Sequence, residues 1–210
     1  MSELSSNRIL KIYKSRNTIL DLLKFQNYTI SDYAEFSINE IDAMYTNDQL
    51  DMLVTREKDD SKTYVKYYLN SKSLRKENLD TLVEDLFTIE SVLTKKDTLI
   101  VIVNDEPNDT IVERMKYLYD HNGVFIVMHN IERLQYNLLK NVLVPYTEIL
   151  EDTEIENLKK EYNLKDTSQL PEISRFDPHA LAICLRPGQI CKLQRKSNTA
   201  MNYFYYRVCL

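Results

Sequence analysis

Residues 99–128 read LIVIVNDEPNDTIVERMKYLYDHNGVFIVM, and this stretch decides the fold class of the chain. It begins and ends with the continuous apolar runs Leu99–Val103 and Val124–Met128, which are typical of strands buried on both faces of a sheet. The residues between them predict a helix that begins at Asn108 or Asp109 and buries one apolar face. A strand–helix–strand connection of this kind predicts two neighbouring parallel strands.

The preceding residues add a long helix and a hairpin to this unit. Apolar spacing over 9–23 predicts a helix with a broad buried stripe, and Arg16 is expected among the basic residues around that stripe. Alternating apolar residues over 50–55 and 63–69 predict two strands on either side of a polar turn. The sheet is therefore expected to be mixed, with antiparallel and parallel strands together.

Three further helices are expected in the same region. One begins near Ser31 and is interrupted by a capping box at Ser37–Glu40, a second covers 78–93, and a short one covers 131–138. Residues 1–142 are thus predicted to form one α/β domain with a mixed sheet.

Residues 143–210 are predicted to form a second, small α+β domain, because the charge pattern changes there. Residues 147–173 carry eight acids and three bases, whereas residues 174–210 carry six bases and one acid. The expected elements are a helix around Ile155–Tyr162, a short helix after Asp177–Pro178, a type II turn over Arg186–Gln189, and strands over Ile190–Gln194 and Tyr203–Val208.

Composition excludes several classes of function. The chain of 210 residues has only two glycines, Gly123 and Gly188, so neither of the usual glycine-rich phosphate-binding loops can be written. The net charge of −5 disfavours a freestanding nucleic-acid binder. The three cysteines and three histidines show no metal-ligand spacing, so no cofactor and no metal site are expected. No membrane segment or signal peptide is seen, and an intracellular protein is expected.

A metal-dependent nuclease is the sharpest enzymatic alternative. Such enzymes bind Mg²⁺ with carboxylates on neighbouring strands and place a lysine near the attacking water. Asp51 and the Asp60–Ser61–Lys62 stretch have residue types of this kind. A hairpin turn accounts for the same residues, because Asp and Ser are favoured in turns for backbone reasons. The turn is the preferred interpretation.

A basic stretch over residues 62–76 combines five cations with interleaved tyrosines and has no acid. It fits contact with nucleic-acid phosphates, but on composition alone a solvated strand with tyrosines in the core is the preferred interpretation. The five cations are Lys62, Lys66, Lys72, Arg75 and Lys76.

The last 68 residues resemble a known family in six short motifs that occur in the same order. They are Leu143–Pro145, Gln169–Ile173, Asp177–Pro178, Arg186–Ile190, Arg195–Ala200 and Tyr203–Val208. This series is similar to the fifth subunit shared by eukaryotic RNA polymerases I, II and III, whose archaeal counterpart lacks the N-terminal domain. The N-terminal elements agree with that family in order, and the resemblance is to the eukaryotic or large-DNA-virus type.

The resemblance implies a non-catalytic structural subunit of a DNA-directed RNA polymerase. Its N-terminal domain, with a topology like that of restriction endonucleases, would form part of the lower jaw beside downstream double-stranded DNA. Its C-terminal domain would dock on the largest subunit, among other polymerase subunits. The implied interface residues are Pro145, Asp177, Pro178, Arg186, Gly188, Gln189, Arg195, Ser197, Thr199, Ala200, Tyr206 and Arg207. The implied DNA-proximal residues are the five cations above and Pro107.

The chain departs from the family pattern at several positions. Phe176 replaces a glycine, Lys196 a proline and Asn198 a glutamate, and the family's loop near DNA becomes the acidic stretch Glu106–Asp109. This divergence suggests a viral polymerase, with location in the virion or host cytoplasm; a cellular protein would be nuclear. A divergent nuclease and a freestanding adaptor remain the alternatives.

Overall fold

The computed structural model describes residues 3–69, 71 and 74–210. The chain forms two compact units, Met1–Asn137 and Leu138–Leu210. The predicted boundary lay later, between residues 142 and 143. The second unit begins earlier because Leu138–Lys140 forms a 3₁₀ turn, and Leu139 packs against the core of that unit.

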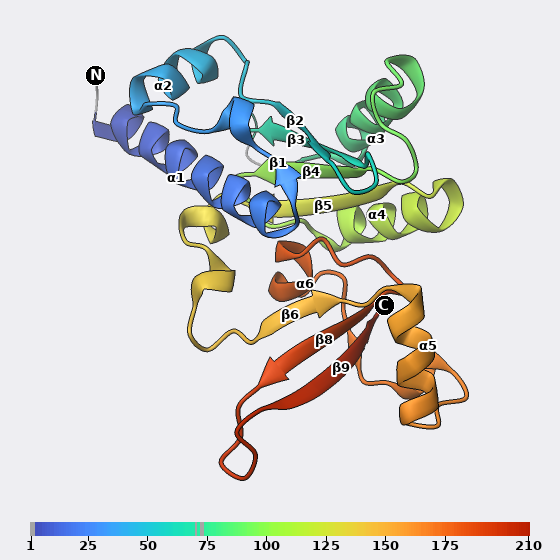
Figure 1. Cartoon of the computed structure of the whole chain (residues 1–210). Coiled ribbons are helices and arrows are strands. Elements are labelled where there is room, and N and C mark those ends of the chain that lie inside the picture. Colours follow the sequence, from blue (N-terminus) through green and yellow to red (C-terminus); the bar gives the residue numbers. More distant parts are fainter. Residues whose placement is uncertain (1–2, 70, 72–73) are drawn as a thin grey trace. The chain divides into compact units, whose positions relative to one another are not determined.

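The N-terminal unit is built on a five-stranded mixed sheet in the order β1-β2-β3-β4-β5 (Figure 1). β1, β2 and β3 pair antiparallel, whereas β3, β4 and β5 pair parallel, which confirms the hairpin and the strand–helix–strand unit. All six residues of β4 are buried, as its continuous apolar sequence predicts. The strands are β1 (Tyr28–Thr29), β2 (Met52–Arg56), β3 (Lys62–Tyr68), β4 (Thr98–Val103) and β5 (Phe125–Asn130).

Within the described residues, four α-helices accompany this sheet, and their ends follow local capping chemistry. The Asn108 side chain accepts a hydrogen bond from the Ile111 amide at the start of α4, and Gly123 ends the helix at φ 72°. The predicted capping box is present, with Ser37 and Glu40 bonding each other's backbone at the start of α2. The helices are α1 (Glu3–Phe25), α2 (Ile38–Thr46), α3 (Lys76–Glu84) and α4 (Asp109–Asn122).

Three predicted helices are shorter than expected. The helix expected from Ser31 is only a 3₁₀ turn, Ser31–Tyr33, before the capping box. The helix expected to run to residue 93 continues beyond α3 only as a π-helical turn, Asp85–Ile89. The helix expected over 131–138 is wrong: Arg133–Gln135 forms a 3₁₀ turn, and the extended backbone at Tyr136 ends it.

The C-terminal unit contains a second mixed sheet, in the order β6-β8-β9-β7. β6, β8 and β9 are antiparallel, and the short β7 is parallel to β9. Two small cores form, one with α6 residues and Leu193, the other with Leu158 of α5 and Ile190. The elements are β6 (Tyr146–Ile149), α5 (Asp152–Glu161), a 3₁₀ turn (Thr167–Gln169), β7 (Glu172–Ile173), α6 (Pro178–Ala182), β8 (Ile190–Arg195) and β9 (Tyr203–Cys209). These elements confirm the prediction that the last residues are α+β.

Candidate functional site

The turn before β8 closes on the end of β9. Gly188 has φ 87°, as a type II turn requires, and its amide donates to the Cys209 carbonyl at 2.9 Å. The Gln189 side-chain oxygen accepts from the Arg186 amide at 2.8 Å. The backbone and the Gln189 side chain thus fix the turn, and Gly188 itself is exposed.

Helix α6 begins at the Asp177–Pro178 motif. The Asp177 carboxylate accepts from the His179 amide at 2.8 Å, and Pro178 occupies the first turn. His179 Nε2 lies 2.9 Å from the Thr147 hydroxyl, whose oxygen is also 3.1 Å from the Pro145 carbonyl. These contacts link α6 to β6. Burial lowers the pKa of His179, so this imidazole favours the neutral form.

The connection between β8 and β9 presents its motif to solvent. Residues 196–204 are exposed, and the Ser197 amide donates to the Ala200 carbonyl at 3.0 Å. The hydroxyls of Ser197 and Thr199 lie 3.0 Å apart, and the Thr199 amide donates to the Ser197 hydroxyl at 3.2 Å. The tip is therefore a locally bonded turn whose outer surface is free of other described residues.

Two basic side chains of this hairpin lie over one aromatic ring. The Arg195 guanidinium lies 4.7 Å from the centre of the Tyr205 ring, and the Arg207 guanidinium lies 5.5 Å from the same ring. Buried Arg207 Nε has no hydrogen-bond partner among the described residues. Tyr206 packs edge-on against Tyr162, the residue that caps the end of α5, with ring centres 5.8 Å apart. The predicted interface residues thus fall into two groups, those that shape the unit and those that are exposed.

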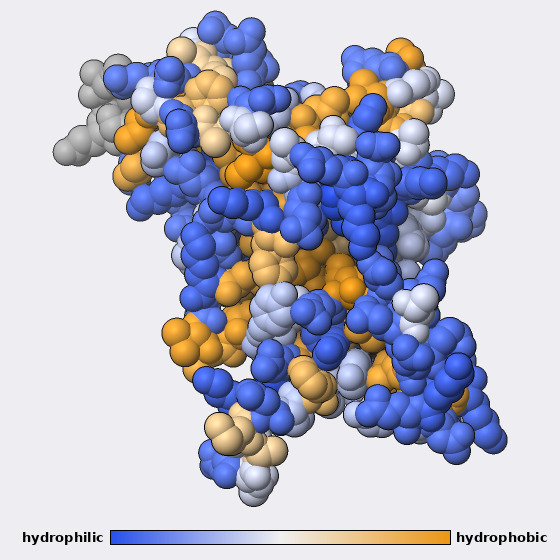
Figure 2. All heavy atoms as spheres, in the orientation of Figure 1, coloured by the Kyte–Doolittle hydropathy of each residue, from blue (hydrophilic) through white to orange (hydrophobic). Residues whose placement is uncertain are grey.

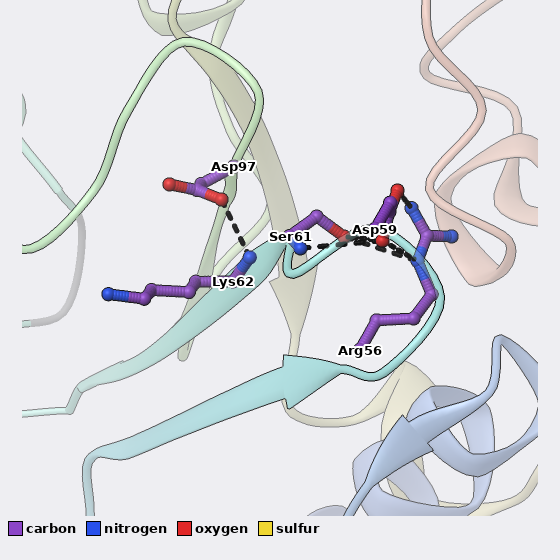
Figure 3. A network of polar contacts seen from close by, with 5 residues as sticks. All are labelled: Arg56, Asp59, Ser61, Lys62 and Asp97. Carbon is purple, nitrogen blue, oxygen red and sulfur yellow. Dashed lines mark hydrogen bonds and ion pairs between the residues drawn. The ribbon is translucent and has the colours of Figure 1, made fainter.

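The structure places the basic stretch in three different settings. Lys62 is exposed at the start of β3, where its amide donates to Asp97 Oδ1 at 2.6 Å and its ammonium extends away (Figure 3). Lys66 is ion-paired with Asp51. Arg75 and Lys76 are exposed at the start of α3. Lys72 lies outside the described residues, and Pro107 is half-buried just before α4.

The residues considered for a nuclease metal site, Asp51 and Lys62, do not come together in the structure. In the ladder between β2 and β3, Lys62 pairs with Thr55. Asp51 lies four residues before Thr55 on the opposite strand, so it is four residues along the hairpin from Lys62. At about 3.3 Å per residue, that offset is on the order of 13 Å. Asp51 is already bound by Lys66, by the Tyr64 hydroxyl at 3.1 Å and by a backbone amide.

The turn between β2 and β3 uses its acids for structure. Asp59 accepts from Arg56 and from the Ser61 hydroxyl, and these bonds hold the pKa of Asp59 at about 2 (Figure 3). Asp60 adopts the left-handed backbone conformation of the turn, with φ 53°.

Among the described residues, no group of three or more His, Cys, Asp or Glu side chains could hold a metal ion. The part of the chain that is described contains no helix long and apolar enough to span a bilayer.

Two buried polar residues were missed by the sequence analysis. Arg16 points into the core rather than toward solvent: its Nη1 donates to the Leu50 carbonyl at 2.9 Å, and the Phe36 ring lies 5.4 Å away. Its position four residues after Ile12 and three before Ile19 could have revealed this, because all three share one helix face. His129 is buried in β5, where desolvation lowers its pKa to about 4.

Comparison with known proteins identifies the C-terminal unit. Residues 136–209 match the family described as RNA polymerase Rpb5, C-terminal domain. Subunit Rpo5 of the DNA-directed RNA polymerase of Thermococcus kodakarensis is 42% identical over 74 residues, which are 35% of this chain and 89% of that protein. The Nitrosopumilus maritimus Rpo5 is 43% identical over 67 residues, which cover 32% and 80% of the two chains.

A plant relative extends the match to the N-terminal unit. The Arabidopsis thaliana subunit 5B of DNA-directed RNA polymerases IV and V is 24% identical over 208 residues, or 97% of this chain and 91% of that protein. The class of protein is therefore a subunit of multi-subunit DNA-directed RNA polymerases. Within that class, the chain belongs to the Rpb5 family, the fifth subunit.

Proposed function

We propose that this chain, a structural subunit of a DNA-directed RNA polymerase, joins the enzyme by docking residues 138–210 on the largest subunit. The observation that carries this proposal is the extent of the archaeal match. The aligned 74 residues make up 89% of the Thermococcus kodakarensis subunit but 35% of this chain. A protein consisting of little more than this unit is named as a polymerase subunit, so the assembly function is best assigned to the corresponding unit here.

Within this unit, the two groups of motif residues would have different roles. Asp177, Gln189 and Pro145 bond to neighbouring backbone or side chains and would shape the surface. The exposed residues Pro178, Ser197, Thr199 and Ala200 would contact the partner. Arg195 and Arg207, held over Tyr205, would supply positive charge beside them.

The N-terminal unit is proposed to lie beside downstream DNA as part of the lower jaw, with a topology like that of restriction endonucleases. The support is the plant match over 97% of the chain, which includes this unit. Exposed Arg75 and Lys76, after the C-terminal end of β3, would face the DNA phosphates, with Pro107 after the same end of β4. Lys62 begins β3, roughly 20 Å along the strand from that end, and would reach DNA only from the other edge of the sheet. Lys66 would contribute less, because Asp51 neutralises it.

In the proposed function, this chain contributes no catalytic residue to RNA synthesis. Its nuclease-like residues are separated along the hairpin, and Asp51 is occupied by Lys66 and Tyr64. The chemistry of nucleotide addition would belong to other subunits. Its location would follow that of the polymerase, in the nucleus of a cell or in the virion or host cytoplasm for a virus.

The proposed function is tested by purifying the tagged full-length chain from its source. We expect a multi-subunit polymerase to co-purify at one copy of this chain per largest subunit, resistant to nuclease treatment. Recovery of the chain alone, with polymerase activity in the unbound fraction, would support the freestanding adaptor instead.

A further inference from the structure

The outer edge of β9 is open over most of its length. β9 pairs with β8 from Tyr203 to Cys209, but β7 pairs only with Val208 and Cys209 on the other side. β7 cannot begin earlier than Glu172, because a 3₁₀ turn and Pro171 precede it and proline has no amide hydrogen to continue the ladder. Among the described residues, no second strand pairs with Tyr203–Arg207.

The hydrogen bonds identify which backbone groups face this open edge. The amide of Cys209 donates to Gln189 and its carbonyl accepts from Gly188, so odd-numbered residues of β9 face β8. The Val208 amide donates to Pro171 on the opposite side. Because the direction alternates along a strand, the amides and carbonyls of Phe204 and Tyr206 point outward. These four groups form no ladder bonds within the described residues.

Over Tyr203–Tyr206 this edge has no proline, no bulge and no charged residue to oppose strand pairing. Natural edges are blocked by proline, bulges, charges or covering elements. Here the sequence Tyr203–Tyr206 is four consecutive aromatic residues, and its register with β8 is unbroken. Phe204 is 50% exposed, and the hairpin extends beyond α5 and α6 (Figure 1), where moderately apolar and hydrophilic side chains lie side by side at its projecting end (Figure 2). An unprotected edge of this kind is suited to an added strand.

The positive charge of the hairpin favours an acidic segment as the strand added to β9. Residues 190–210 contain four bases and no acid. A second copy of this hairpin would bring like charges together across the new ladder, which is destabilising. An acidic strand would instead place its carboxylates near these cations. The four bases are Lys192, Arg195, Lys196 and Arg207.

We infer that the open edge of β9 binds an extended, acidic segment of another polymerase subunit as an added β-strand. This inference rests on the proposed function, and it names the chemistry of the partner: main-chain hydrogen bonds to Phe204 and Tyr206, with carboxylates toward Arg207 and Arg195, which lie over the same Tyr205 ring. Lys192 would contribute less, because it lies 3.8 Å from Glu148. Apolar side chains of the segment would pack beside the exposed Phe204 ring, over which the Lys192 ammonium lies at 4.3 Å.

Hydrogen–deuterium exchange, read at single amides by fragmentation mass spectrometry, tests this inference without a variant. In the free chain, the amides of Phe204 and Tyr206 should exchange faster than those of Tyr205 and Arg207, which face β8. In the purified polymerase we expect Phe204 and Tyr206 to slow by at least about tenfold, to the rate of their neighbours, because strand pairing protects outward amides.

The exchange experiment separates the two proposals. If the chain co-purifies with the polymerase but these two amides exchange unchanged, the added strand is wrong and the docking proposal stands. If the chain does not co-purify, both fail. If duplex DNA protects these amides in the free chain, the edge binds DNA. If a higher concentration of the free chain protects them, the edge binds a second copy. Either result would overturn the inference.

A pair of variants at one position gives an independent test. Phe204→Pro removes an outward amide without breaking a bond to β8, while Phe204→Ala removes the same ring and keeps the amide. In competition with the unmodified chain for incorporation into polymerase, we expect Phe204→Pro to be at least about tenfold weaker than Phe204→Ala. Equal incorporation of the two folded variants, checked by circular dichroism, would contradict main-chain pairing.

Discussion

Gly188 holds a backbone conformation that only glycine adopts without strain. Its φ is 87°, yet a Cβ at this position would meet no atom within 4 Å. The cost of a side chain is therefore backbone strain rather than a clash. We predict that Gly188→Val lowers the free energy of unfolding by more than about 1 kcal/mol in urea titrations.

A second variant at Gly188 tests whether backbone strain causes the predicted loss of stability. Gly188→Asn should cost less than Gly188→Val, because asparagine tolerates positive φ better than a β-branched residue. If both variants were as stable as the unmodified chain, the turn would not need its left-handed residue.

His129 should make the stability of the N-terminal unit depend on pH. Its pKa falls from 6.5 to about 4 on folding, chiefly through burial and secondarily through Arg133. The unfolded chain then binds a proton that the folded chain does not, so stability is lost as pH falls from about 6.5 toward 4. The loss is on the order of 3 kcal/mol at the lower end.

The pH dependence is measured by urea unfolding at several pH values between 7 and 4. His129→Phe cannot be protonated, and its slope of unfolding free energy against pH should be flatter than that of the unmodified chain. An unchanged slope would show that other groups carry the acid sensitivity.

Arg16 shows that residue type alone does not predict burial. An arginine was expected in solvent, but its guanidinium lies among aromatic rings and bonds to the Leu50 carbonyl. That environment is assembled from the segment after α1 and from Leu50, two residues before β2 begins, which are distant from Arg16 in sequence. Helical spacing could place Arg16 on the buried face, but it could not supply the partners.

At the scale of elements, the β2–β3 hairpin decides between a nuclease and a structural role. Asp51 and Lys62 are separated by the register, so no metal site is expected to form between them. Plasmid DNA incubated with the pure chain and Mg²⁺ or Mn²⁺ should remain uncut. Cleavage that disappears in Asp51→Ala would contradict the structural role.

The start of α3 and the neighbouring loop carry the proposed DNA-facing charge. Arg75 and Lys76 are exposed there. Each phosphate contact contributes about 0.9 to the slope of log binding constant against log salt, so R75Q/K76Q should reduce the slope of the assembled polymerase by up to about 2. Loss of the same number of charges at K14Q/K24Q, on exposed positions of α1, should leave it unchanged. Equal slopes for the two double variants would remove this face from DNA contact.

Elements with strong local signals were predicted well, and those without them were not. The buried runs of β4 and β5, the cap at Asn108 and the glycine after α4 each fix an element from within a few residues. The segment 131–138 has helical spacing but lacks a cap. It instead divides into 3₁₀ turns on either side of extended Tyr136.

At the scale of the whole molecule, the C-terminal motifs were readable from sequence, whereas their surface roles needed three dimensions. Six short motifs in order sufficed to suggest the family. Their spacing could not show that Gln189 bonds within its own turn or that β7 covers only the end of β9. These features depend on strand order, which sequence patterns leave open.

Residues 138–210 are proposed to carry the docking function. The most direct measurement is capture of the largest polymerase subunit by tagged fragments 1–137 and 138–210, with the full chain as the reference. We predict capture by 138–210 at the stoichiometry of the full chain and none by 1–137. Capture by the N-terminal fragment alone, with a folded C-terminal fragment left unbound, would show that docking does not reside in residues 138–210.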